Sequence, residues 1–218
     1  MWGVVNLIPT KEEWNKALCE RHGEKLQKNF SSGAVAICGL GGLGSNIAVS
    51  LARAGIGKLI LIDFDKVDIT NLHRQQYKAN QIGMDKTEAL SENLKEIAPY
   101  ILIESHTVRM TEDNAAELLK DADIICEAFD DAECKAMLAN LVLETMPDKF
   151  LVAASGMAGF GSANSIRTRK ITSKFYLCGD EESDVRSEGS LVSSRVMLCA
   201  AHQAHTVLRI LAEQFETE

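Results

Sequence analysis

The sequence predicts a doubly wound α/β fold, in which helices cover both faces of a mostly parallel sheet. Short apolar runs such as AVAIC (34–38) and KLILID (58–63) are typical of strands buried on both faces. Stretches with apolar side chains at helical spacing lie between these runs, so strands and helices alternate along the chain. Because 46% of the 218 residues are hydrophobic, the chain can bury the core of one large domain, which we expect to span 1–218.

The first two thirds of the chain contain the clearest succession of elements. Apolar residues at helical spacing predict an N-terminal helix over 11–29, ahead of the strand 34–38. A glycine-rich turn, a helix of small residues and the strand 58–63 follow, and together they make a βαβ unit. Asp85 and Thr111 each precede a further amphipathic helix. Alternating apolar and polar residues predict a strand at 101–110, and two more apolar runs predict strands at 123–129 and 150–155.

The C-terminal third differs in character from the rest. Residues 156–170 and 173–178 predict two short antiparallel strands, which form a small extension of the sheet. Residues 179–190 (GDEESDVRSEGS) are acidic and almost free of apolar side chains, so we expect a mobile surface loop there. A closing amphipathic helix begins at Ser193.

Charge and cysteine usage argue against several classes of function. The formal net charge of −8 disfavours a nucleic-acid partner, because such a partner requires a basic surface. The chain has no run of about eighteen apolar residues and no signal-peptide pattern at its N-terminus, so we expect a cytoplasmic protein with no membrane partner. The six cysteines form no C-x-x-C pair, and we interpret them as reduced thiols.

The glycine turn after the first strand predicts a nucleotide site. Gly39, Gly41 and Gly44 fit the pattern G-x-G-x-x-G. The first glycine permits a tight turn, the second lets a phosphate approach backbone N–H groups, and the third packs the helix on the strand. Asp63 ends the next strand, where a ribose hydroxyl lies in dinucleotide-binding proteins. This pattern does not distinguish ATP from NAD, so an NAD-dependent oxidoreductase stays open at this point.

The polar segment DFDKVDITNLHRQ (63–75) favours ATP. A polar turn explains some of its residues, but it does not explain the cation Arg74 followed by Lys86. Two cations beside a phosphate-binding turn suit phosphoryl or nucleotidyl transfer, which depends on positioning and charge neutralisation. Asp130 follows another strand, where a carboxylate is suited to Mg²⁺ and equally to capping the next helix.

Two stretches, GLGGLGSNIAVSLARAGIGKLILIDFDKVDITNLHRQ (39–75) and GMDKTEAL (83–90), resemble the ThiF and MoeB branch of the ubiquitin-activating-enzyme superfamily. The compact chain is most similar to a ThiF-type sulfur carrier protein adenylyltransferase. The resemblance implies a Rossmann-like fold and the use of ATP and Mg²⁺. It also implies a reaction in which the C-terminal glycine carboxylate of a ThiS-like, ubiquitin-like carrier attacks the α-phosphate of ATP and releases pyrophosphate, for thiamine thiazole biosynthesis.

The resemblance further implies roles for individual residues. Arg74 and Lys86 engage the phosphates, Asp63 holds the ribose and Asp130 holds Mg²⁺. Relatives are usually homodimers in which an arginine comes from the partner's N-terminal segment, and Arg21 is the candidate here. Some relatives form a covalent link through a loop cysteine. Cys178, at the mouth of the acidic loop, is the candidate, although acidic neighbours raise a thiol pKa and favour an inert role. The implied nucleotide-binding residues are Gly39, Gly41, Gly42, Gly44, Asp63, Asp65, Asn71, Arg74, Gln75 and Lys86.

Departures from the family pattern define what else is expected. Many relatives carry two C-x-x-C pairs that bind zinc, and because this chain has none we expect no zinc site. The main alternative activity is an ATP-dependent tRNA-modifying dehydratase of the same superfamily, which the acidic C-terminal part disfavours. A non-catalytic nucleotide-binding relative is the second alternative, which the presence of Arg74, Lys86 and Asp130 disfavours.

Overall fold

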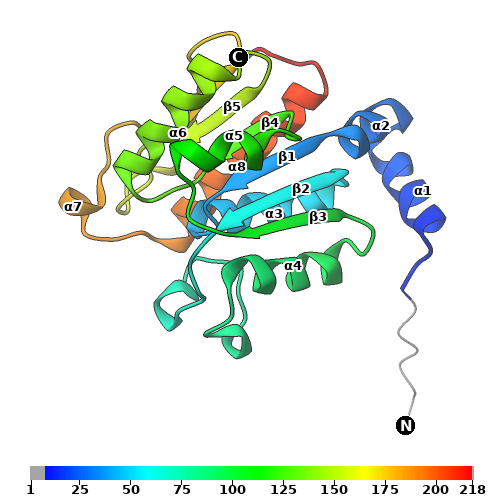
Figure 1. The fold of residues 1–218 in the computed structure, drawn as a ribbon, viewed down its shortest axis with the longest axis horizontal. Helices are drawn as coiled ribbons and strands as arrows, with labels where there is room; N and C mark the ends of the chain where they lie inside the picture. Colours follow the sequence, from blue (N-terminus) through cyan, green and yellow to red (C-terminus); the bar gives the residue numbers. More distant parts are fainter. Residues whose placement is uncertain (1–7, 218) are drawn as a thin grey trace.

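A seven-stranded sheet forms the centre of the part of the chain that the computed structural model describes, residues 8–217 (Figure 1). Its strand order is β3-β2-β1-β4-β5-β7-β6, and every neighbouring pair is parallel except β6 with β7. The fold is therefore the predicted doubly wound, mostly parallel sheet with an antiparallel edge. The strands are β1 (Ala34–Cys38), β2 (Lys58–Asp63), β3 (Leu102–Thr107), β4 (Ile124–Glu127), β5 (Phe150–Ala154), β6 (Arg167–Lys170) and β7 (Phe175–Gly179).

Helices cover both faces of this sheet. On one face α3, α4 and α8 pack together, and on the other α5 and α6 form a second layer. Figure 1 shows α1 and α2 at one end of the sheet, while α7 and the loops after β2 lie at the end to which the parallel strands point. The helices are α1 (Lys11–His22), α2 (Glu24–Ser32), α3 (Gly42–Ala54), α4 (Lys86–Ile97), α5 (Glu112–Leu119), α6 (Ala132–Thr145), α7 (Val185–Glu188) and α8 (Ser193–Leu211).

Side chains along a central strand point alternately to the two faces of the sheet, and both faces are covered by helices. This explains why the central strands are continuous apolar runs in the sequence. Val35 and Ile37 of β1 belong to the core beneath α3, α4 and α8, whereas Ala36 and Cys38 belong to the core beneath α5 and α6. All four residues are fully buried. Because a central parallel strand is covered on both sides, each of its side chains is selected to be apolar or small.

The N-terminal helix differs from its prediction. The structure has two helices, α1 and α2, rather than one over 11–29, and Gly23 separates them. Gly23 has a φ of 85° and a ψ of 147°, a positive-φ conformation that lies outside the helical region and favours glycine, so α1 ends there. Of the C-terminal predictions, β6 covers only the last four residues of 156–170, and β7 pairs in parallel with β5 as well as antiparallel with β6.

The acidic segment 179–190 also differs from the expected plain loop. It contains the short helix α7, and the side chain of Asp180 forms an ion pair with Arg195 in the interior of the protein. A buried charge partner thus anchors the beginning of this segment. Among residues 8–217, no helix combines the length and the apolar character that crossing a membrane requires.

Candidate nucleotide-binding site

A cavity of about 490 Å³ opens at the carboxyl ends of the parallel strands. It lies where the chain order of the sheet reverses, between β1 and β4, which is the usual ligand position in open α/β sheets. Every residue that the sequence assigns to nucleotide or metal binding lines this cavity, with the single exception of Gly44. The structure therefore brings together side chains that lie between residues 39 and 130 of the chain.

The glycine turn forms the floor of the cavity. Gly39 has a φ of 91°, and a Cβ atom there would lie 2.8 Å from the backbone oxygen of Ala128. Gly44 lies beneath the turn, because its Cβ would lie 1.8 Å from the backbone oxygen of Gly39. Gly41 faces open space instead, with no atom closer to its Cβ position than 3.8 Å. Since α3 begins here, unpaired backbone N–H groups of its first turn are available to an anion.

Asp63 joins the glycine turn to the polar segment that follows β2. Its carboxylate accepts the Leu40 backbone N–H at 2.6 Å through one oxygen and the Asp65 N–H at 2.8 Å through the other. The residue is only 8% exposed, and this burial raises the pKa of its carboxyl, while the nearby charge of Lys86 lowers it. Asp63 thereby fixes the loop geometry, and its remaining lone pairs face the cavity that it lines.

The two predicted cations reach the cavity from different elements. Lys86 begins α4, is buried, and places its Nζ atom 2.8 Å from an oxygen of Asp65. Arg74 lies at the end of the polar segment, where its Nη1 atom donates to the backbone oxygen of Thr70 at 3.1 Å. A ligand with negative charge in this cavity would meet both cations, as the sequence predicts.

Two buried polar atoms of the cavity wall have no protein partner. Within residues 8–217, the Nε atom of Arg74 and the Oε1 atom of Gln75 make no hydrogen bond although both are buried. Leaving a buried polar group unpaired costs about 1–3 kcal/mol, so such groups usually serve a ligand or water. Asn71 is held at the cavity because its Oδ1 atom accepts the Asp68 backbone N–H at 3.0 Å.

The two acidic residues after β4 both line the cavity but differ in their hydrogen-bond partners. Asp131 caps α6, because its Oδ1 atom accepts the Cys134 backbone N–H at 2.9 Å. Asp130 lines the cavity, is exposed, and makes no hydrogen bond or ion pair with the rest of residues 8–217. The capping role therefore belongs to Asp131, and Asp130 keeps both oxygens free.

Asp130 fits a magnesium ion that is shared with a polyphosphate. Residues 8–217 contain no group of three or more His, Cys, Asp or Glu side chains able to hold a metal. Mg²⁺ commonly takes only one or two carboxylates and completes its shell with phosphate oxygens and water. An unpaired carboxylate in a cavity that Arg74 and Lys86 also line is consistent with that type of site.

The sequence-based prediction omits an ion pair beside the cavity, between Glu127 and Lys135. Glu127, the last residue of β4, is 2% exposed, and Lys135 of α6 approaches both its oxygens, at 2.9 and 3.0 Å. Lys135 also lines the cavity and donates to the Ala154 backbone oxygen at 3.2 Å. Glu127 in turn accepts the Phe129 N–H at 2.8 Å, so the pair fixes the backbone just before Asp130. A glutamate inside the apolar run IICEAF was the available sequence signal.

Arg21 and Cys178 lie away from this cavity. Arg21 is an exposed residue of α1, at the other end of the sheet. Cys178 lies within β7 rather than at the mouth of a mobile loop, and its side chain is fully buried. Burial raises the pKa of the Cys178 thiol to about 11. This corrects the expected location of Cys178, since a nucleophilic thiol needs exposure and a lowered pKa.

We expect thiol reagents to confirm the placement of Cys178. Cys19 and Cys134 are partly exposed, whereas Cys38, Cys126, Cys178 and Cys199 are buried. Native protein at pH 8 should therefore release no more than two equivalents of thionitrobenzoate from Ellman's reagent, and all six thiols should react after denaturation. The Cys178→Ser variant should give the same native reading as the unchanged protein. A third rapid equivalent that disappears in this variant would show that Cys178 is accessible.

The fold and this cavity define a nucleotide-binding protein of the doubly wound α/β class. The chain belongs to the ThiF family, since a sequence model of that family matches residues 15–218.

Curated relatives cover part of the same region. The chain is 35% identical over 142 residues to the adenylyltransferase and sulfurtransferase MOCS3 of Caenorhabditis briggsae, a match that covers 64% of this chain and 35% of the relative. It is 31% identical over 126 residues to the sulfur carrier protein adenylyltransferase of Thermus thermophilus, covering 56% of this chain and 46% of the relative. The match thus spans less than half the length of these relatives.

Solved structures share the fold at lower identity. The E. coli tRNA N6-threonylcarbamoyladenosine dehydratase TcdA in complex with ATP superposes with a TM-score of 0.83 at 22% identity, covering 95% of this chain and 98% of that chain. The E. coli protein MccB with ATP gives a TM-score of 0.68 at 23% identity, covering 88% and 60%. At these identities the similarity concerns the fold.

Proposed function

We propose that this protein is an ATP-dependent adenylyltransferase that acts on the C-terminal glycine carboxylate of a ubiquitin-like sulfur carrier protein. One carboxylate oxygen of the carrier bonds to the α-phosphorus, and the bond between that phosphorus and the bridging oxygen to the β-phosphate breaks. Pyrophosphate leaves with the electron pair, and the product is an acyl-adenylate. The observation that carries this proposal is the cavity that combines Gly41, Asp63, Arg74, Lys86 and Asp130.

Each of these residues has a task in this reaction. The N–H groups at Gly41 and Gly42 face the negative phosphates, and Asp63 accepts a hydrogen bond from the ribose. Arg74 and Lys86 stabilise the charge that develops on the leaving pyrophosphate. Asp130 holds Mg²⁺, which when bound neutralises further phosphate charge. Contacts within the protein hold both cations at the cavity, since Lys86 pairs with Asp65 and Arg74 donates to the Thr70 backbone oxygen.

The finer assignments follow the same proposal. The carrier is ThiS-like. Its acyl-adenylate is the activated form that accepts sulfur for thiamine thiazole biosynthesis in the cytoplasm. Arg21, exposed on α1, completes the site of a second copy in a homodimer. The net charge of −8 supports a protein substrate rather than tRNA, although the fold is shared with a tRNA dehydratase.

ATP–pyrophosphate exchange tests this proposal directly. The purified chain should exchange label between pyrophosphate and ATP when a ThiS-like carrier ending in Gly-Gly is present, and not without it. A carrier that lacks the terminal glycine is the matched control and should give no exchange, because its carboxylate no longer reaches the α-phosphate.

Two other results would overturn the proposal. Exchange that depends on unmodified or modified tRNA instead of the carrier would identify the dehydratase type of substrate. ATP binding without exchange under any of these conditions would identify a non-catalytic relative.

A further inference from the structure

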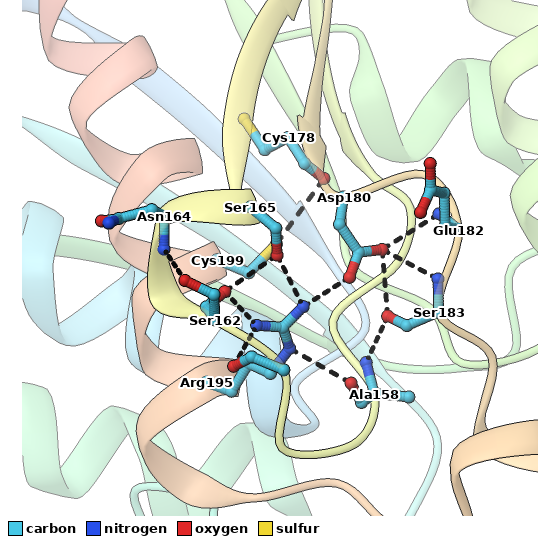
Figure 2. Close-up of polar contacts among 11 residues, drawn as sticks. Ala158, Ser162, Asn164, Ser165, Cys178, Asp180, Glu182, Ser183, Arg195 and Cys199 are labelled. Carbon is cyan, nitrogen blue, oxygen red and sulfur yellow. Dashed lines mark hydrogen bonds and ion pairs between the residues drawn. The ribbon is translucent and has the colours of Figure 1, made fainter.

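Arg195, in the first turn of α8, is buried with its whole guanidinium group hydrogen-bonded (Figure 2). Its Nε atom donates to the Ala158 backbone oxygen at 3.1 Å, and its Nη1 atom donates to the backbone oxygens of Gly161 at 2.9 Å and Ser162 at 2.7 Å. Its Nη2 atom donates to the Ser165 hydroxyl at 3.1 Å and to the carboxylate of Asp180. All five N–H donors of an arginine thus have partners.

Asp180 extends this network to a second segment. Its other carboxylate oxygen accepts the backbone N–H groups of Glu182 at 3.0 Å and Ser183 at 2.9 Å, as well as the Ser183 hydroxyl. The Ser183 hydroxyl also accepts the Ala158 N–H at 3.0 Å. Figure 2 shows these contacts converging on one guanidinium and one carboxylate. We call Arg195 and Asp180 with their bonded segments, 155–166 and 180–192, the clamp.

The two segments of the clamp pack closely because glycines allow their backbones to approach each other. A Cβ atom on Gly156 would lie 2.0 Å from an oxygen of Asp180, and Gly156 has a φ of 76°. Gly159 donates its N–H to the Ser190 backbone oxygen at 2.9 Å, which joins the two segments a second time. These contacts fix the position of segment 155–166 relative to segment 180–192, although neither segment contains a long helix or strand.

The clamp supports one wall of the nucleotide cavity without lining it. Met157 from the first segment, Val185 and Leu191 from the second, and Val196 from α8 all line the cavity, whereas Arg195 and Asp180 do not. The charged groups of the cavity come instead from the end of β2, from the segments after β2, β3 and β4, and from the first turns of α4 and α6. The wall that the clamp holds is thus apolar and carries none of the cations or the Asp130 carboxylate.

We propose that Arg195 and Asp180 are positioning residues that fix this apolar wall as the path for the acyl substrate, the C-terminal tail of the carrier, and that they act on the carrier and not on the nucleotide. The inference rests on the proposed function. A buried ion pair is seldom retained for stability alone, because apolar residues of similar volume often do as well. A fork of five hydrogen bonds does fix irregular backbone, and an approach path to the α-phosphate must be fixed because small displacements of reacting groups slow a reaction strongly.

Arg195→Lys and Asp180→Asn test this role. Lysine keeps the charge but loses the planar fork, and asparagine keeps the side-chain volume but loses the charge. In ATP–pyrophosphate exchange we expect the KM for the carrier to rise roughly 10-fold in each variant, while the Kd for a fluorescent ATP analogue stays within about 2-fold. Trypsin cleavage after Arg186, an exposed residue of α7, should accelerate in both.

Arg209→Lys on the same helix is the matched control. Arg209 donates to the backbone oxygen of Glu216 and lies outside the clamp and the cavity, so both constants should equal those of the unchanged protein. Asp180→Asn keeps the test valid if Arg195→Lys lowers the melting temperature too far. If the wild-type enzyme is active, two results overturn this inference but leave the proposed function standing. Either both variants keep the wild-type KM for the carrier, or their Kd for the ATP analogue rises in parallel with that KM. A wild-type enzyme with no carrier-dependent exchange overturns the proposed function together with this inference.

Discussion

Asp130→Asn is expected to lower carrier-dependent ATP–pyrophosphate exchange at least about 100-fold without unfolding the protein. The Asp130 carboxylate lines the cavity and is unpaired within residues 8–217, so its loss removes no structural contact. It does remove the carboxylate proposed to hold Mg²⁺ beside the phosphates, and losing one electrostatic contact of this kind typically costs 10²–10³ in rate. Exchange rates measured over a series of MgCl₂ concentrations should show a higher half-saturating concentration for the variant.

Asp131→Asn is the matched control for this substitution. Asp131 differs from Asp130 by a single position but caps α6 through the Cys134 N–H. Asparagine is also a good cap, so exchange should remain near the wild-type rate and the melting temperature should change little. Equal losses of exchange in the two variants would show that the acidic turn as a whole, and not the free carboxylate, is required. Unchanged exchange in Asp130→Asn would remove this residue from the proposed site.

The sheet and most of the cavity follow from local features of the sequence. Buried parallel strands read as apolar runs because both faces are covered, and Gly39 and Asp63 mark the carboxyl ends of β1 and β2. In a doubly wound fold these ends meet at one edge, so a prediction of the elements already brings Arg74, Lys86 and Asp130 close together. The predicted residues of the cavity were accessible to sequence reasoning because they lie in the segments that follow strands or at the start of a helix, whereas Lys135, inside α6, was missed.

The charge pairs were not accessible in the same way. Asp180 stands in a polar, acidic stretch and Arg195 stands in a helix. Nothing in their local spacing indicates that the two side chains become buried together. Tertiary packing decides this, since the guanidinium meets carbonyl groups some 30 residues away in the chain. The short helix α7 and the buried anchor at Asp180 within 179–190 were not predicted for the same reason. Gly23 similarly ends α1 through a positive φ that apolar periodicity does not reveal.

Lys135→Met is expected to lower the free energy of unfolding by about 3 kcal/mol at pH 7.5, because it leaves the Glu127 carboxylate buried without its counter-charge. Glu127 is 2% exposed, and Lys135 is its partner at 2.9 Å. Losing one partner of a buried ion pair costs more than the pair itself contributes, since the remaining charge stays desolvated. Methionine fills a similar volume, so the cavity wall is kept.

The loss should depend on pH with a definite sign. Burial raises the pKa of Glu127 in the folded protein, and the charge of Lys135 lowers it. In Lys135→Met the folded pKa therefore rises further, while in the unfolded chain it stays near the ordinary value of about 4.3. As the pH falls through the raised folded value, the folded variant takes up a proton that the unfolded chain does not yet bind, and stability returns. The deficit relative to wild type is thus largest at neutral pH and shrinks toward pH 5.

Urea unfolding between pH 5 and 8 measures this dependence, and a double variant supplies its control. Glu127→Gln combined with Lys135→Met removes both charges, while the glutamine oxygen still accepts the Phe129 N–H. We expect the deficit of the double variant to be smaller than that of Lys135→Met at pH 7.5 and to vary less with pH, because the double variant has no buried carboxyl at position 127 to titrate. A deficit in Lys135→Met that stays constant from pH 5 to 8 would mean that Glu127 is not the charged partner. The turn before Asp130 would then be held mainly by the backbone contacts around β4, and the same substitution should leave exchange unaffected.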